Sequence, residues 1–166
     1  MKVQDVAIPE LVVPALHVQK ILVPIDFSTP CNKAFKYALG FARQFGSQIV
    51  MIHVIEPAGV VETEQSGVEG TPRDRSELAL AEDKMQALAD ASPRDGNLNI
   101  TSGVRRGVAT HEIVQAAEEL DVDLIIMATH GIRGWKHFGL GSTADRVARA
   151  APCPVLVVRE REREFI

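Results

Sequence analysis

Residues 123–158 have the sequence DLIIMATHGIRGWKHFGLGSTADRVARAAPCPVLVV. This segment begins and ends in short apolar runs, 123–128 and 154–158, that are continuous rather than alternating. Continuous runs of this length are typical of strands buried on both faces of a parallel sheet. A helical pattern, 142–151, stands between them and ends before Pro152. The segment therefore predicts a strand, a loop, a helix and a second parallel strand.

The same alternation continues through the earlier part of the chain. Three further apolar runs predict strands, at 20–25, 48–55 and 98–104. Helical patterns lie between them, at 30–45, 73–91 and 110–120. Gly46 is expected to end the first helix, and Thr110 to cap the start of the third. Together these patterns predict an α/β fold, a single doubly wound five-stranded parallel sheet with helices on both faces and right-handed crossovers.

The rest of the chain divides around this core. We expect an N-terminal arm at 1–19, one domain at 20–159, and a charged C-terminal tail at 160–166 that is solvated and salt-bridged. Residues 56–72, rich in Gly, Pro, Glu and Thr, predict a long loop.

Composition excludes several classes of protein. The chain has 166 residues, 46% of them hydrophobic, and a formal net charge of −4. One domain with a sizeable core fits these values, whereas a nucleic-acid surface would need clustered Lys and Arg. No apolar run approaches the ~20 residues of a membrane span, and the N-terminal segment is a poor secretory signal. The two cysteines, Cys31 and Cys153, are expected to be reduced thiols in the cytoplasm.

The loop after the fourth predicted strand resembles a cradle for an anion. Its glycines allow backbone N–H groups to approach a phosphate, and the following helix begins with Ser142 and Thr143. Arg133 and Lys136 add positive charge. The alternative is that the glycines only shape a turn and that Ser142 only caps the helix.

Two further strand ends carry candidate groups, because ligands of open parallel sheets bind at the carboxyl ends of the strands. Asp26 follows the first strand and can accept hydrogen bonds from a ribose; alternatively it caps the next helix, together with Ser28 or Thr29. The backbone of Val54, at the end of the second strand, can meet an adenine ring, or it can simply belong to a core strand.

Familiar catalytic motifs do not occur in the sequence. It has no GxxxxGK[ST] motif and no glycine-rich loop directly after the first strand. His130 shows no metal-ligand spacing with the other histidines, so we interpret it as a support for the phosphate loop, with a general-base role as the alternative. The sequence therefore offers parts for binding phosphate and few for transferring it.

Three segments carry a resemblance to a known family: KILVPIDFS (20–28), IVMIHVIEP (49–57) and residues 123–158. They resemble the universal stress proteins, in their nucleotide-binding branch, over about residues 20–159. The family motif is Gly, two residues, Gly, nine residues, Gly, then Ser or Thr. Gly131, Gly141 and Ser142 match it, and Ala128 stands at the first glycine position. The added methyl group could narrow the site.

This resemblance implies a sheet of order 3-2-1-4-5, Rossmann-like and similar to the adenine nucleotide α-hydrolases. It also implies a site for ATP or AMP, with or without Mg2+. Asp26 would hold the ribose and the Val54 backbone the adenine. The other implied contacts are Pro24 and Ile25 at the adenine, Met127, Ala128, His130 and Gly131 near the ribose and phosphate, and Gly141, Ser142 and Thr143 at the phosphates.

Several functions remain open at this point. The leading hypothesis is a regulatory stress-response protein that binds ATP, ADP or AMP, and cyclic AMP is an alternative ligand. The second is a slow ATPase, or an enzyme that phosphorylates itself at Ser142 or Thr143. The third is a protein-interaction dimer that binds no nucleotide. We assign no catalytic residue and no metal ligand, and expect neither nucleic acid nor a membrane as partner.

The fifth strand is also implicated in assembly. In the implied strand order its residues 155–158 lie at an edge of the sheet, and family members commonly dimerise there. We therefore expect a homodimer. The alternative is that Leu11, Val12 and Val13 of the N-terminal arm cover this edge.

Overall fold

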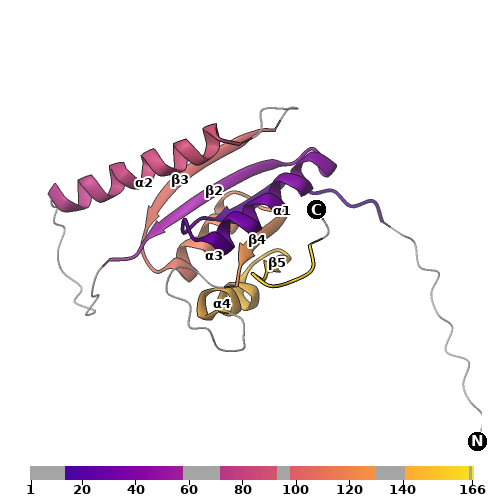
Figure 1. Ribbon diagram of the computed structural model, residues 1–166. Helices are drawn as coiled ribbons and strands as arrows, with labels where there is room; N and C mark the ends of the chain where they lie inside the picture. Colours follow the sequence, from indigo (N-terminus) through magenta and orange to yellow (C-terminus); the bar gives the residue numbers. More distant parts are fainter. Residues whose placement is uncertain (1–13, 58–71, 93–97, 130–140, 165) are drawn as a thin grey trace, which may run out of the picture.

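The computed structural model describes residues 14–57, 72–92, 98–129, 141–164 and 166. Strands and helices alternate along the chain (Figure 1). The strands are β1 (Lys20–Pro24), β2 (Gln48–Ile55), β3 (Ile100–Arg106), β4 (Leu124–Ala128) and β5 (Val155–Val158). The helices are α1 (Thr29–Phe45), α2 (Pro72–Asp90), α3 (Ala109–Glu119) and α4 (Ser142–Ala150).

The strands form one five-stranded sheet of order β3-β2-β1-β4-β5, and every neighbouring pair is parallel. This confirms the predicted fold class and strand order. Alternate residues of β1 face opposite sides, as the pleat requires. Ile21 and Val23 join a core cluster with α1 and α2, whereas Leu22 joins a second cluster with α3 and α4. The sheet is therefore buried on both faces, which explains its continuous apolar runs.

The boundaries of the third strand were predicted wrongly. The apolar signal favoured 98–104, but β3 covers Ile100–Arg106. Its pairing with β2 runs from Ile49↔Ile100 to Ile55↔Arg106, so the longer neighbour sets its length. β3 lies at an edge of the sheet and is largely exposed, which is why its outer residues are polar.

Helix ends were predicted with mixed success. Gly46 ends α1 with a left-handed φ of 72°, as expected. Ser28 begins α1 and its side chain accepts a hydrogen bond from the Cys31 N–H at 3.3 Å. The prediction for α3 was wrong: Val108 holds the cap position, and Thr110 lies inside the first turn. The carboxylate of Glu56, the residue directly after β2, replaces the missing cap, because Glu56 Oε1 accepts from the Ala109 N–H at 3.0 Å.

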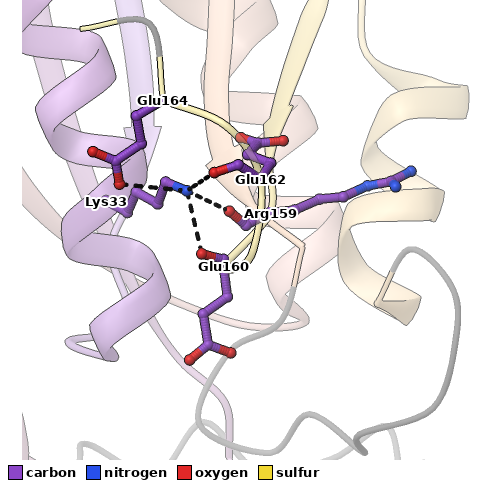
Figure 2. A network of polar contacts seen from close by, with 5 residues as sticks. All are labelled: Lys33, Arg159, Glu160, Glu162 and Glu164. Atoms are coloured by element: carbon purple, nitrogen blue, oxygen red, sulfur yellow. Dashed lines mark hydrogen bonds and ion pairs between the residues drawn. The ribbon is translucent and has the colours of Figure 1, made fainter.

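The C-terminal tail is anchored to α1. Lys33 Nζ donates to the backbone carbonyls of Arg159, Glu160 and Glu162 at 3.0, 3.2 and 3.3 Å, and lies 3.5 Å from the Glu164 carboxylate (Figure 2). Farther along α1, a methyl group placed on Gly40 would meet Ile166 at 3.5 Å, and the C-terminus lies beside this helix in Figure 1. The expected ion pair is present, but main-chain carbonyls make most of the contacts.

Some expectations concern residues that the structure does not describe. The proposed edge cover, Leu11, Val12 and Val13, lies outside the described residues, and so does most of the 56–72 loop. Of the arm, residues 14–19 are described, and Val18 packs against the core cluster of α1 and α2. Among the described helices, none combines the length and apolar character needed to cross a membrane.

Candidate functional site

A cleft of about 590 Å³ lies at the carboxyl ends of β1, β2 and β4. It falls in the volume range of ~300–1,000 Å³ typical of small-molecule sites. β1 lies between β2 and β4, and the connections that follow β1 and β4 leave towards opposite faces of the sheet. Such a switch point leaves a crevice that helices do not fill. The starts of α3 and α4 and one side of α2 complete its walls.

Nine of the eleven predicted site residues line this cleft. They are Pro24, Ile25, Asp26, Val54, Met127, Ala128, Gly141, Ser142 and Thr143. The other two, His130 and Gly131, lie outside the described residues, as do Arg133 and Lys136. Residues from three strand ends and one helix start, more than 100 positions apart in the chain, therefore meet in one place.

Asp26 stands at the exit of β1, in a turn that fixes its carboxylate. Asp26 Oδ1 accepts a hydrogen bond from the Ser28 N–H at 2.9 Å. Ser28, and not Asp26, is the N-cap residue of α1. The Asp26 carboxylate stabilises the turn before the helix. A carboxylate has room for several hydrogen bonds, so this contact leaves Asp26 able to accept from a ligand hydroxyl.

The backbone of Val54 extends past the end of β1. Beyond Pro24, the Ile25 N–H still donates to the Ile52 carbonyl at 2.7 Å. In a strand, the N–H and C=O groups of alternate residues point to the same neighbour. The N–H and C=O of Val54 therefore face the β1 side of β2, as those of Ile52 do. At the level of Val54, however, β1 no longer pairs with β2, because their pairing ends at Pro24 and Ile52. One donor and one acceptor are thus presented side by side to the cleft.

The start of α4 forms the opposite wall. α4 begins at Ser142, and its cap residue Gly141 provides no side-chain hydrogen bond. The first amides of a helix have no partner within the helix, so Ser142 and Thr143, which line the cleft, bring partial positive charge to this wall. The Gly141 N–H differs, because it donates to the Thr129 carbonyl at 3.0 Å. Gly141 thus shapes the wall and its own amide is occupied.

Ala128 occupies the position where the family motif has glycine. Its side chain packs against the core cluster of α1 and α2. Val54 and Met127, by contrast, pack with the α3 and α4 cluster. The extra methyl group therefore points away from the face on which Val54 and Met127 lie, which reduces its effect on the width of the cleft there.

Sequence reasoning missed several cleft residues. α2 contributes Glu77, Leu80 and Lys84, which lie in a helix that no motif marks. Glu56 was placed in a loop but caps α3 at the rim. The position of Glu56 directly after an apolar run was an available signal, because it follows a strand that ends at the cleft. For the α2 residues no local signal exists.

Cys31 forms part of the buried wall beside Asp26. Its side chain is 2% exposed, and its Sγ lies 3.5 Å from the Pro24 carbonyl. Burial, with a smaller contribution from the negative charge of Asp26, raises the pKa of the Cys31 thiol to about 12. A neutral, inaccessible thiol is a poor nucleophile. Both cysteines are free thiols, as expected from the sequence.

Metal-binding clusters are absent from the part of the chain that the structure describes, where no group of three or more His, Cys, Asp or Glu is placed to hold an ion. The described cleft wall has three carboxylates on separate segments: Asp26 at the exit of β1, Glu56 at the α3 cap and Glu77 on α2. The arrangement can accept hydroxyl protons, pair with the edge of a base and attract an anion at the α4 start.

Comparison with known proteins settles the family. The model of the universal stress protein family matches residues 17–159. The chain belongs to the universal stress protein family. A universal stress protein of Methanocaldococcus jannaschii is 34% identical over 148 residues, which cover 88% of this chain and 85% of that protein.

Solved structures of family members share the fold. Universal stress protein UspA from Lactobacillus plantarum aligns with a TM-score of 0.67 at 25% identity, covering 87% of this chain and 100% of that one. A universal stress protein in complex with cAMP aligns at 22% identity, with a TM-score of 0.57 and coverage of 87% and 98%. An Arabidopsis thaliana family protein with AMP bound aligns at 19% identity, with a TM-score of 0.51 and coverage of 89% and 96%.

Proposed function

We propose that this universal stress protein binds an adenine nucleotide, ATP, ADP or AMP, in the cleft and acts as a regulatory protein in the cytoplasm during stress. One observation carries the proposal: the backbone N–H and C=O of Val54 face the cleft beyond the paired end of β1. The Watson–Crick edge of adenine presents an acceptor beside a donor and fits such a pair.

The other parts of the nucleotide then have defined neighbours. The ribose lies at Asp26, whose carboxylate accepts from its hydroxyls. The phosphates lie at the α4 start, where the amides and hydroxyls of Ser142 and Thr143 donate. His130 and Gly131 complete the phosphate loop by analogy with the family motif. Two proteins of the same fold, solved with cAMP and with AMP, hold an adenine ring and a phosphate.

Mg2+ would enter with the phosphates of ATP rather than in a cage of protein ligands. Mg2+ commonly keeps several waters and binds substrate phosphates plus one or two carboxylates. The described cleft provides single carboxylates, such as Asp26, which suits this mode of binding. The proposed function is nucleotide binding without hydrolysis, because no familiar phosphoryl-transfer motif occurs in the sequence. A slow ATPase is the alternative that a phosphate-release assay would detect.

Calorimetry tests the proposal. Wild type is titrated with ATP, ADP, AMP and cyclic AMP, and Gly141→Val with whichever bind. Gly141 has φ −55° and ψ 150°, which valine can adopt without backbone strain, and the valine side chain adds volume to a residue that lines the cleft. We expect affinity to fall about tenfold or more. Ala150→Val, at the other end of α4, is the control and should bind as wild type does.

The outcomes separate the competing functions. If wild type binds none of the four nucleotides, nucleotide sensing is wrong and an interaction dimer without nucleotide takes its place. Robust phosphate release would instead favour the enzyme. Equal binding by wild type and Gly141→Val would contradict the placement of the phosphates at the α4 start.

We also propose a homodimer formed through β5. β5 is an edge strand, and its residues Val155, Leu156 and Val157 are half-buried in the monomer. The Thr129 N–H donates to the Val158 carbonyl, so the backbone groups of Val157, one residue earlier, point to the open edge. Two copies paired about a two-fold axis would satisfy them. Val157→Pro removes one donor and should shift sedimentation towards the monomer, whereas a monomeric wild type would contradict the dimer.

A further inference from the structure

A side chain continues the contact between β1 and β2 beyond the last paired residues. The Ile25 N–H donates to the Ile52 carbonyl at 2.7 Å, and His53 Nδ1 lies 2.7 Å from the Ile25 carbonyl. Because a carbonyl oxygen can only accept, Nδ1 must carry the proton. Ile25 is thus held by β2 through both its N–H and its C=O, one bond coming from the backbone and one from His53.

The same histidine packs against the turn that follows. The rings of His53 and Phe27 have centroids 4.7 Å apart and a tilt of 44°. Phe27 has a left-handed φ of 61°, a conformation unfavourable for a residue with a Cβ. Lys84 Nζ lies 5.4 Å from the centroid of the Phe27 ring. An unfavourable backbone conformation persists only where surrounding contacts impose it, and His53 supplies one of these contacts.

Asp26 lies between the two residues that His53 contacts. The Ile25 carbonyl belongs to the peptide bond that joins Ile25 to Asp26, so holding it fixes the backbone on one side of Asp26. The left-handed Phe27 fixes the other side and brings the Ser28 N–H to Asp26 Oδ1 at 2.9 Å. The orientation of the Asp26 carboxylate therefore depends on a histidine 27 positions later in the chain.

We propose that His53 is a positioning residue for the ribose subsite: through Ile25 and Phe27 it orients the Asp26 carboxylate, and so sets the preference of the cleft for ribonucleotides over 2′-deoxyribonucleotides. The inference rests on the proposed adenine-nucleotide function. It goes beyond that function because it names the residue that orients the Asp26 carboxylate towards the ribose. In this role His53 acts through its contacts with Ile25 and Phe27.

The experiment measures a ratio of affinities. AMP and 2′-deoxy-AMP are titrated calorimetrically into each protein. The dissociation constant of 2′-deoxy-AMP divided by that of AMP measures the preference for a ribose with a 2′-hydroxyl. A hydroxyl that donates to a carboxylate should make this ratio about ten or more in wild type. Asp26→Ala should bring it close to one.

Two histidine variants separate the hydrogen bond from the ring contact. His53→Phe keeps an aromatic ring beside Phe27 and removes the Nδ1 donor, so its ratio should fall towards that of Asp26→Ala. His53→Asn can place an amide N–H near the position of Nδ1, so its ratio should stay closer to that of wild type. His17→Phe, an exposed histidine before β1, is the matched control and should keep the wild-type ratio. Thermal unfolding of each variant checks that it is folded.

The results distinguish failure of the inference from failure of the function. If wild type prefers AMP and His53→Phe shows the same preference, His53 does not position Asp26, although nucleotide binding stands. A wild-type ratio near one would equally overturn the inference. If wild type binds neither compound nor any other adenine nucleotide, the proposed function is wrong and the inference falls with it.

Discussion

Two hollows of similar size differ in how their polar groups are used. The cleft at the strand ends measures about 590 Å³, and a groove between α1, the end of α2 and the C-terminal tail measures about 620 Å³. In the groove, the Lys33 side chain is only 13% exposed, and its ammonium is surrounded by three carbonyls and a carboxylate of the same chain (Figure 2). In the cleft, the Val54 backbone and the α4 start face the open space.

This difference shows that volume alone does not identify a binding site. Buried polar groups must be hydrogen-bonded, and in the groove the protein satisfies its own. In the cleft, the groups at the strand and helix ends suit the partners that a nucleotide offers. We therefore expect changes in the groove to affect stability, and changes at the cleft rim to affect binding.

Lys33→Met should lower the stability of the protein more than ionisation of Cys31 at pH 10 does. Methionine keeps most of the apolar stem but removes the ammonium that donates to Arg159, Glu160 and Glu162. Three carbonyls lose their donor, and the free energy of unfolding should fall by about 2 kcal/mol. Urea unfolding measures this loss, and faster tryptic cleavage within residues 159–163 would show that the tail is released.

The control for this prediction lies in the same groove. Lys36 is exposed and also lines it, so Lys36→Met should change stability by no more than about 0.5 kcal/mol. Neither variant should change the affinity for AMP. A loss of affinity in Lys33→Met comparable with that of Gly141→Val would contradict the separation of the two hollows.

The buried Cys31 thiol in the cleft wall should make the free energy of unfolding depend on pH. Its pKa is raised from 9.0 to about 12, chiefly by burial. The folded state therefore keeps this proton where the unfolded state loses it. Stability from the buried thiol is complete below pH 9 and is lost as the pH rises above 9, so between pH 8 and pH 10 it should fall by about 1.4 kcal/mol.

The measurement compares wild type with Cys31→Ala by urea unfolding at pH 8 and pH 10. Both proteins retain Cys153, whose pKa burial also raises, so its contribution cancels. The stability advantage of wild type over the variant should shrink between the two pH values. An advantage that does not change with pH would show that the Cys31 site is open to water.

The sequence predicted the fold through features that are local. Continuous apolar runs mark buried parallel strands, and Gly46 marks the end of α1 because its left-handed conformation favours glycine. The prediction was wrong at β3, whose ends depend on the length of β2, and at Thr110, because Glu56, which follows β2, caps α3. Both errors concern contacts between segments far apart in the chain.

The candidate site also contains residues that the sequence predicted and contacts that it could not predict. Asp26, Val54, Gly141 and Ser142 were predicted because each directly follows or ends a strand or begins a helix, and the parallel topology brings such positions to one edge. The contact of Lys84 with the Phe27 ring could not be predicted, because no spacing in the sequence relates α2 to the exit of β1.

The sequence by itself determined the order of strands and helices, the burial of both faces of the sheet and the edge at which the candidate cleft lies. Only the tertiary structure decided which polar groups at that edge remain available, since this depends on where β1 stops pairing with β2 and on where the tail returns to α1. The physical reason is that a hydrogen bond requires two groups at a fixed distance and angle, whereas an apolar pattern requires only that a residue be buried.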